Sequence, residues 1–203
     1  MYKIEWQILG QAVYSNRRFK CGKNADWFKA DDIAQLYKDI LKNTGVKLCK
    51  SEKFFRIGEH AAITILTTVM ALEQCPPDAN IDFGTAAVLG YGDDGSHYGN
   101  LKYWHDFEDN GKVAAQGHLF VGTLASTPLC QLALTLGCHA PVYYVSPVGE
   151  SSILTNELDF VHGQCRNLFF IEVKNDYCSC MVLSAANSGF ASEEIVKLSE
   201  EMR

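Results

Sequence analysis

Residues 86–92, AAVLGYG, decide the fold class. This short apolar run contains two glycines at its end, which is typical of a strand buried on both faces at the centre of a sheet. A long apolar helix is predicted before it at residues 58–74, with hydrophobic side chains almost all round, and Pro76-Pro77 ends that segment. A second apolar run, VYYV at residues 142–145, follows it. Helices between strands predict an α/β protein with a mixed sheet.

The remaining elements are predicted from hydrophobic periodicity and turn residues on either side of that central strand. We expect one mixed five-stranded sheet with flanking helices, in a single domain over residues 1–203. Loops are expected at 15–24, which is polar and basic, and at 93–117, around one short helix. Strands are expected at 4–9, 86–92, 142–145, 168–173 and 180–185, and helices at 30–41, 58–74, 126–136, 151–163 and 191–203, the last one polar.

The charge and the N-terminal residues exclude several classes of protein. A formal net charge of -6 disfavours a nucleic-acid groove, which needs many Lys and Arg side chains. No apolar run is long enough to span a bilayer, and residues 1–15 lack the small-residue cleavage site of a secretory signal. We therefore expect a cytoplasmic protein whose eight cysteines remain thiols, with Cys178 and Cys180 on one face of a strand.

The chemistry-bearing residues form no recognised cofactor or metal motif. The glycines at 90, 92 and 95 do not have dinucleotide-loop spacing and precede no phosphate-binding lysine, so tight turns are the favoured interpretation. A zinc site built from His97, His105 and His118 with Asp106 is not indicated by their spacing. We therefore expect no cofactor and no metal.

Three further segments resemble the N-terminal half of β-ketoacyl synthases, in the thiolase-like superfamily. They are GTLASTP at residues 122–128, GCHAP at 137–141 and GESS at 149–152. In that family a similar helix leads through G-L-x-G-P and a strand to T-A-C-S-S, whose Cys is the acyl nucleophile. FFR at 54–56 and the strand at 86–92 look like earlier parts of the same half. The resemblance runs from about residue 2 to 185 and implies a thiolase-like half-fold.

Two departures from the family pattern change what the resemblance implies. Gly149 stands at the position of the lost nucleophile, and glycine cannot form a thioester. The half that carries the family's two catalytic histidines is also missing, so we expect no catalytic residue and no synthase activity from this chain alone. Such chains resemble the short chain-length factor subunits of aryl polyene-type biosynthesis. The resemblance implies a heterodimer with a full-length β-ketoacyl synthase in fatty acid or polyene biosynthesis, and contact with acyl carrier protein through that complex.

The same resemblance implies where the partner and the acyl chain would lie. The strand before the nucleophile pairs with its counterpart across the dimer axis, which corresponds here to Val142, Tyr143, Tyr144 and Val145. The segment that closes the partner's acyl tunnel corresponds to His118, Leu119 and Phe120, with Leu119 and Phe120 as the chain-length gate. The alternative is that Leu119 and Phe120 fill this chain's own core.

The helix predicted at 151–163 provides independent support for a half-fold. In the complete fold of that family this helix is enclosed between two sheets, whereas here one face is polar, which indicates contact with water or a polar cover. The alternative is that it is an ordinary surface helix. The apolar stripe is Ile153, Leu154, Leu158 and Val161, and the opposite face is Thr155, Asn156, Asp159 and His162.

Two other functions remain open at this point. One is an independent cysteine-dependent acyltransferase or hydrolase that uses Cys130 or Cys138, although neither is placed at a helix N-terminus, where the helix dipole activates a thiol. The other is a homodimeric scaffold that binds acyl carrier protein. Labelling with a thiol-reactive acyl probe distinguishes the first from the second, and co-purification with a synthase distinguishes both from a heterodimeric subunit.

Overall fold

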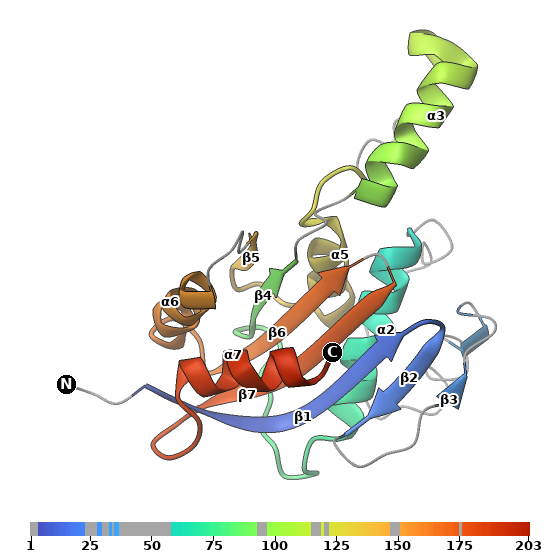
Figure 1. Ribbon diagram of the computed structural model, residues 1–203. Coiled ribbons are helices and arrows are strands. Elements are labelled where there is room, and N and C mark those ends of the chain that lie inside the picture. The colour runs from blue at the N-terminus through green and yellow to red at the C-terminus, as the bar shows by residue number, and fades with distance from the viewer. Residues whose placement is uncertain are drawn as a thin grey trace.

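A computed structural model describes residues 4–22, 28–29, 33, 35–36, 58–92, 97–114, 119, 122–146, 151–174 and 176–203. These residues form a seven-stranded sheet with strand order β3-β2-β1-β7-β6-β4-β5 (Figure 1). Strand β4 lies parallel to β5 and β6, and the other neighbouring strands are antiparallel, so the sheet is mixed as predicted. The strands are β1 (Glu5–Ser15), β2 (Arg18–Cys21), β3 (Phe28–Lys29), β4 (Ala87–Tyr91), β5 (Val142–Val145), β6 (Asn167–Lys174) and β7 (Tyr177–Ala186).

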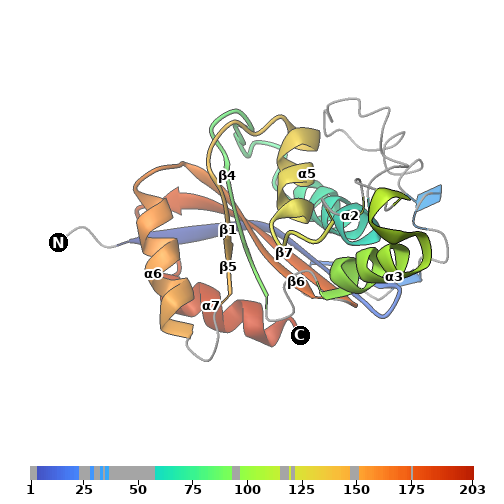
Figure 2. The same ribbon diagram turned by 90° about the horizontal axis from the view of Figure 1, so that it is seen from above.

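Helices cover both faces of the sheet, and the sheet separates two hydrophobic cores (Figures 1 and 2). Helices α2 (Glu59–Glu73) and α5 (Thr127–Leu136) pack on one face, and α6 (Ser151–His162) and α7 (Ser192–Glu201) pack on the other. All four were predicted close to these bounds. The helix predicted at 30–41 lies almost wholly outside the described residues, although 33, 35 and 36 are helical.

The face covered by α2 and α5 depends on close approach to the sheet. A Cβ atom at Gly10 would collide with the carbonyl oxygen of Ala71, and one at Gly90 would collide with the side chain of Leu129. Gly90 is therefore a packing glycine inside β4, and not the turn residue that the sequence predicted. Cys178 and Cys180 belong to the same core, which confirms that they share a face of their strand.

The face covered by α6 and α7 confirms the amphipathic pattern predicted for residues 151–163, except at Ile153, which is only half-buried. Leu154, Leu158 and Val161 are buried against the sheet, and the opposite side of α6 is half-buried or exposed. His162 departs from the prediction, because its ring is half-buried edge-on to Trp6 and its Nε2 lies 3.1 Å from the carbonyl oxygen of Glu5.

The predicted number of five strands is wrong, because β2 lies within residues 15–24, which were predicted as a loop, and β3 was not predicted. β1 continues to Ser15 and turns into β2 through Asn16 and Arg17, which both have positive φ, at 50° and 60°. Left-handed conformation at both central residues is the geometry of a two-residue hairpin. Phe19 is fully buried while Arg18 is exposed, so β2, which lies between β1 and β3, is a polar strand held by one aromatic anchor.

The prediction of loops around one short helix at 93–117 is correct in placing a helix there but wrong about its length. Residues His97–Ala114 form α3, with a break at Gly111, where φ is 72°. The glycines and aspartates of this segment have low helix propensity, so its composition did not indicate a long helix. Helix α3 follows β4 and projects from the body of the molecule (Figure 1).

Candidate functional site

Strand β5 is the end strand of the sheet in the part of the chain that the structure describes. Its bounds, Val142–Val145, are those predicted for the partner-binding strand. It pairs in parallel register with β4, with Val142 beside Val88 and Val145 beside Tyr91. All four β5 residues are half-buried, and none of them carries a charge. An uncharged end strand is a template for pairing with another chain, because natural exposed edges usually carry Lys or Pro.

The hydrogen bonds of β5 show which of its backbone groups face away from β4. The Val88 N–H donates to the Pro141 carbonyl at 3.1 Å, and the Gly92 N–H donates to the Val145 carbonyl at 3.4 Å. Because backbone groups alternate in direction along a strand, those of 141, 143 and 145 point towards β4. The N–H and C=O of Val142 therefore point towards the outer edge of the sheet.

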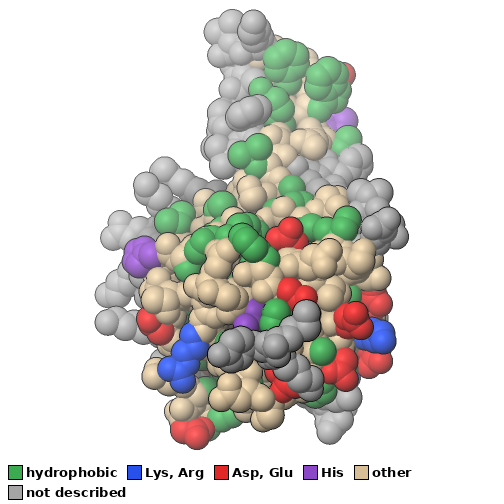
Figure 3. Space-filling model, turned by 90° about the vertical axis from the view of Figure 1, so that its left-hand side faces the viewer, with side chains coloured by type: hydrophobic (Ala, Val, Ile, Leu, Met, Phe, Trp, Pro, Cys, Tyr) green, Lys and Arg blue, Asp and Glu red, His purple; other side chains and the backbone are tan. Residues whose placement is uncertain are grey.

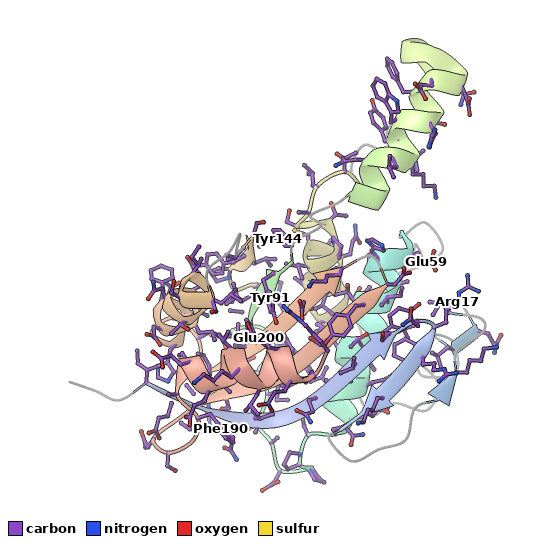
Figure 4. The ribbon with its side chains drawn as sticks, viewed as in Figure 1. Arg17, Glu59, Tyr91, Tyr144, Phe190 and Glu200 are labelled. Atoms are coloured by element: carbon purple, nitrogen blue, oxygen red, sulfur yellow. The ribbon has the colours of Figure 1, made fainter. Side chains whose placement is uncertain are left out.

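The side chains of β5 connect this edge to both cores. Val142 and Tyr144 pack on the side of α2 and α5, whereas Tyr143 and Val145 pack on the side of α6 and α7. The Tyr144 hydroxyl donates a 3.0 Å hydrogen bond to the Gly92 carbonyl, next to the end of β4 (Figure 4). These contacts hold the strand from both faces of the sheet.

Phe160 on α6 is a site residue that the sequence analysis missed. Its ring meets Tyr143 edge-on, with the ring centroids 6.4 Å apart, and its side chain is 57% exposed. The Tyr143 hydroxyl donates a 3.2 Å hydrogen bond to Gln164 Oε1, just beyond α6. The signal in the sequence was a large apolar residue directly next to Asp159, which belongs to the predicted polar face of this helix. Figure 3 faces the side that carries α6 and β5 and shows hydrophobic side chains exposed there.

The predicted gate is only partly described. Leu119 is helical and half-buried, whereas His118, Phe120 and Gly149 lie outside the described residues. Just after Leu119, Gly122 touches the first turn of α3, where a Cβ atom at Gly99 would collide with the Gly122 carbonyl. Of the gate residues only Leu119 is therefore placed, and the role of the gate stays a prediction.

A buried polar cluster lies under α7 and was not predicted. Glu172 on β6 is fully buried, and its carboxylate forms ion pairs with Lys174 at 3.1 Å and Arg203 at 2.6 Å. Arg203 Nε also donates to Glu172 Oε2 at 3.0 Å, and the Tyr91 hydroxyl donates to Ser199 Oγ at 2.9 Å. Burial raises the pKa of the Tyr91 hydroxyl, and the negative charge of Glu172 raises it further. A carboxylate compensated by two cations attaches α7 to the sheet, as a structural element.

Burial and position in the fold distinguish the cysteines of the described residues. Burial raises the pKa of Cys178 to about 12 and those of Cys21 and Cys75 to about 11, which keeps these three thiols protonated at neutral pH. Cys130 is exposed but lies inside α5, past its first residues. Cys138 follows Gly137, the C-cap of that helix. None of these positions has the helix N-terminus that activates a catalytic cysteine.

The described residues contain neither a metal cluster nor a membrane span. No group of three or more His, Cys, Asp or Glu side chains comes together among them. His105 lies on α3 with 71% of its side chain exposed, while His118 falls outside the description. Within the same residues, no helix is both long and apolar enough to cross a membrane.

Comparison with solved structures identifies the fold. No family model and no curated protein matches the sequence. A chain of the ketosynthase ApeO in complex with its chain-length factor ApeC, from Xenorhabdus doucetiae, matches with a TM-score of 0.56 and 8% identity, over 91% of this chain and 80% of that one.

Two further structures show the same similarity. AntDE:AntF, a type II polyketide acyl-carrier protein in complex with its ketosynthase bound to the hexaketide, contains a chain that matches with a TM-score of 0.55 and 10% identity, over 90% of this chain and 58% of that one. The ishigamide ketosynthase/chain length factor contains a chain that matches with a TM-score of 0.55 and 10% identity, over 92% of this chain and 64% of that one. This chain thus spans less than two thirds of these last two chains. The similarity confirms the thiolase-like, ketosynthase-type fold that the sequence predicted.

Proposed function

We propose that this chain is a non-catalytic subunit of the chain-length factor type, which pairs with a full-length β-ketoacyl synthase. The observation that carries the proposal is the placement of β5. In a ketosynthase-type fold, the strand that leads to the nucleophile position is here an uncharged end strand, with the Val142 N–H and C=O directed to its outer edge. Gly149 at the nucleophile position gives the chain no acyl-accepting thiol there.

The partner's β5-equivalent strand would add to this edge in antiparallel register, across an axis that passes close to Val142. Tyr143 and Phe160 would then contact the partner beside the strand pair, because their rings lie on the α6 side of β5. Leu119 and Phe120 would reach the closed end of the partner's acyl tunnel. An apolar gate suits a growing fatty acyl or polyene chain, because it buries no unpaired polar group. Acyl carrier protein would be met through the assembled complex.

Co-expression with a full-length ketosynthase from the same source organism tests the proposal. We expect native mass spectrometry to show a one-to-one complex, and the complex to make elongated acyl products that require the synthase cysteine. A chain that forms only a homodimer, and binds carrier protein without a synthase, would establish the scaffold function instead. Stoichiometric labelling of Cys130 or Cys138 by an acyl-thioester probe would establish the enzyme.

A further inference from the structure

The break in α3 at Gly111 places a reactive pair of residues at an exposed position. Asn110 is the only asparagine of the sequence that is followed by glycine. Both residues are exposed, and α3 projects from the body of the molecule (Figure 1). Gly111 itself leaves the helical conformation, with φ at 72° and ψ at 172°. The Asn110–Gly111 pair therefore lies at the point where the regular part of α3 stops.

An asparagine that precedes a glycine has a specific reaction open to it. The backbone nitrogen of the glycine attacks the side-chain carbonyl carbon, Cγ, of the asparagine. The side-chain amide leaves as ammonia, which takes the proton of the attacking nitrogen, and a cyclic succinimide remains. Water then opens the ring: attack at the side-chain carbonyl gives aspartate, and attack at the main-chain carbonyl gives isoaspartate. The sum is hydrolysis of one amide to a carboxylate and ammonium, with water as the only co-reactant.

Three features of this pair favour ring closure. Glycine has no side chain to obstruct the attacking nitrogen, and its backbone adopts conformations that other residues avoid. Among the described residues, no atom lies within 4 Å of a Cβ built on Gly111, so the ring has space. Helix ends fray, which releases the backbone of Asn110 from the helical geometry that keeps the two reacting atoms apart. Asn100, inside the same helix and followed by Leu101, has neither the glycine nor the helix end.

The reaction would remove contacts that stabilise the last turn before the break. Asn110 Nδ2 donates to the Asp106 carbonyl oxygen at 3.2 Å and to Asp106 Oδ1 at 3.1 Å. A carboxylate at 110 has no proton to donate, and it stands four residues from Asp106, the spacing at which like charges repel on a helix. Glu108 and Asp109 are further acidic residues of this turn. One more anion at the C-terminal end of a helix also opposes the helix dipole.

We infer that Asn110–Gly111 is a site of spontaneous deamidation, and that the reaction shortens the helical part of α3 at this end. The reaction needs no enzyme. Its isoaspartate product also inserts a methylene group into the main chain, which redirects the residues after 110. Modified chains accumulate with time, because neither product returns to asparagine.

Ageing of the purified full chain at near-neutral pH tests the inference by peptide mass spectrometry. We expect the tryptic peptide of residues 103–112 to gain about 1 Da, in two separable forms that contain aspartate and isoaspartate. The rate at Asn110 should exceed that at Asn100 at least about 10-fold. Asn110→Gln should stay unmodified at this position, because its longer side chain would have to close a less favourable ring. In Asn110→Asp, the amides of residues 107–110 should exchange faster than in the natural chain.

The contrary outcomes are equally specific. If Asn110 reacts no faster than Asn100, the pair is not a deamidation site. Reaction only after unfolding in urea would overturn the inference as well, since the folded helix would then protect the pair. Aspartate formed without isoaspartate would exclude the succinimide route. Unchanged amide exchange of residues 107–110 in Asn110→Asp would refute the shortening of α3. None of these results depends on a ketosynthase partner, so the proposed function is tested separately.

Discussion

Tyr143 on β5 and Phe160 on α6 meet edge to face, with their rings at an interplanar angle of 75°. The contact joins the end strand of the sheet to the helix that follows position 149. Phe160 nevertheless exposes 57% of its side chain, so most of its apolar surface is available to another chain. The pair thus links the strand edge proposed for pairing with an aromatic surface beside it.

Phe160 therefore provides a direct test of the interface. Phe160→Glu should weaken binding to the ketosynthase by about 2 kcal/mol or more, because a buried aromatic contact is replaced by a charge without a partner. The free variant should unfold within about 0.5 kcal/mol of the natural chain, as is usual for exposed positions. Calorimetry and urea unfolding measure the two quantities. Lys197→Glu, on the exposed side of α7, is the matched control, and equal Kd values for both variants would refute the contact.

The gate makes a prediction about products. Phe120→Ala should leave the heterodimer assembled and lengthen the acyl products of the partner, because a shorter side chain deepens the tunnel. Mass spectrometry of products released from carrier protein measures the change. If Leu119 and Phe120 fill the core instead, either alanine variant should cost about 2–5 kcal/mol of stability. A stable, fully assembled Phe120→Ala complex with unchanged product length would contradict the gate.

The ion pair beneath α7 makes a prediction about stability. Arg203→Ala removes one of the two cations on the fully buried Glu172, but the arginine side chain is 43% exposed and partly screened by water. We expect a loss of about 1–2 kcal/mol in urea unfolding. The double variant Arg203→Ala/Glu172→Gln should recover part of that loss, because the buried charge is then gone. A double variant that is less stable than Arg203→Ala would indicate that Lys174 alone compensates Glu172.

The buried thiols make a prediction about pH. Burial raises the pKa of Cys178 from an ordinary value of 9.0 to about 12. Above pH 9 the unfolded thiol loses its proton while the folded one keeps it, so this contribution to stability is complete below pH 9 and is lost as the pH rises towards 12. Between pH 9 and 11, the natural chain should lose up to about 1.4 kcal/mol per pH unit more than Cys178→Ala. Cys130→Ala, at an exposed cysteine, should follow the natural chain. Parallel curves for all three proteins would contradict the assignment.

The elements that could be predicted from the sequence are the buried ones that are rich in hydrophobic residues. The central strand, α2 and β5 are dominated by hydrophobic side chains, so hydrophobic pattern alone located them. β2 was missed because one buried aromatic, Phe19, anchors an otherwise polar strand. α3 was predicted only as one short helix among loops, because Leu101 and Trp104 are exposed in the described domain and no continuous buried stripe indicated its full length.

The candidate site shows a similar division. The resemblance to a family implied a pairing role for the strand at 142–145, and the structure places that strand at the end of the sheet. Phe160 and the Glu172–Arg203 pair were missed, because each depends on a contact between distant segments. In the latter, residues 31 positions apart meet only when α7 folds back over β6. Such contacts leave no periodic signal in one sequence.

The most direct test of the central claim is residue-resolved amide exchange along β5, in the free chain and in the complex with the full-length ketosynthase. The Tyr143 amide faces β4 and should exchange slowly in both states, which makes it an internal reference. The Val142 amide faces the outer edge, and its exchange should slow at least about 10-fold when the partner strand accepts its hydrogen bond. A complex in which Val142 exchanges as fast as in the free chain would contradict the claim that this subunit pairs through β5.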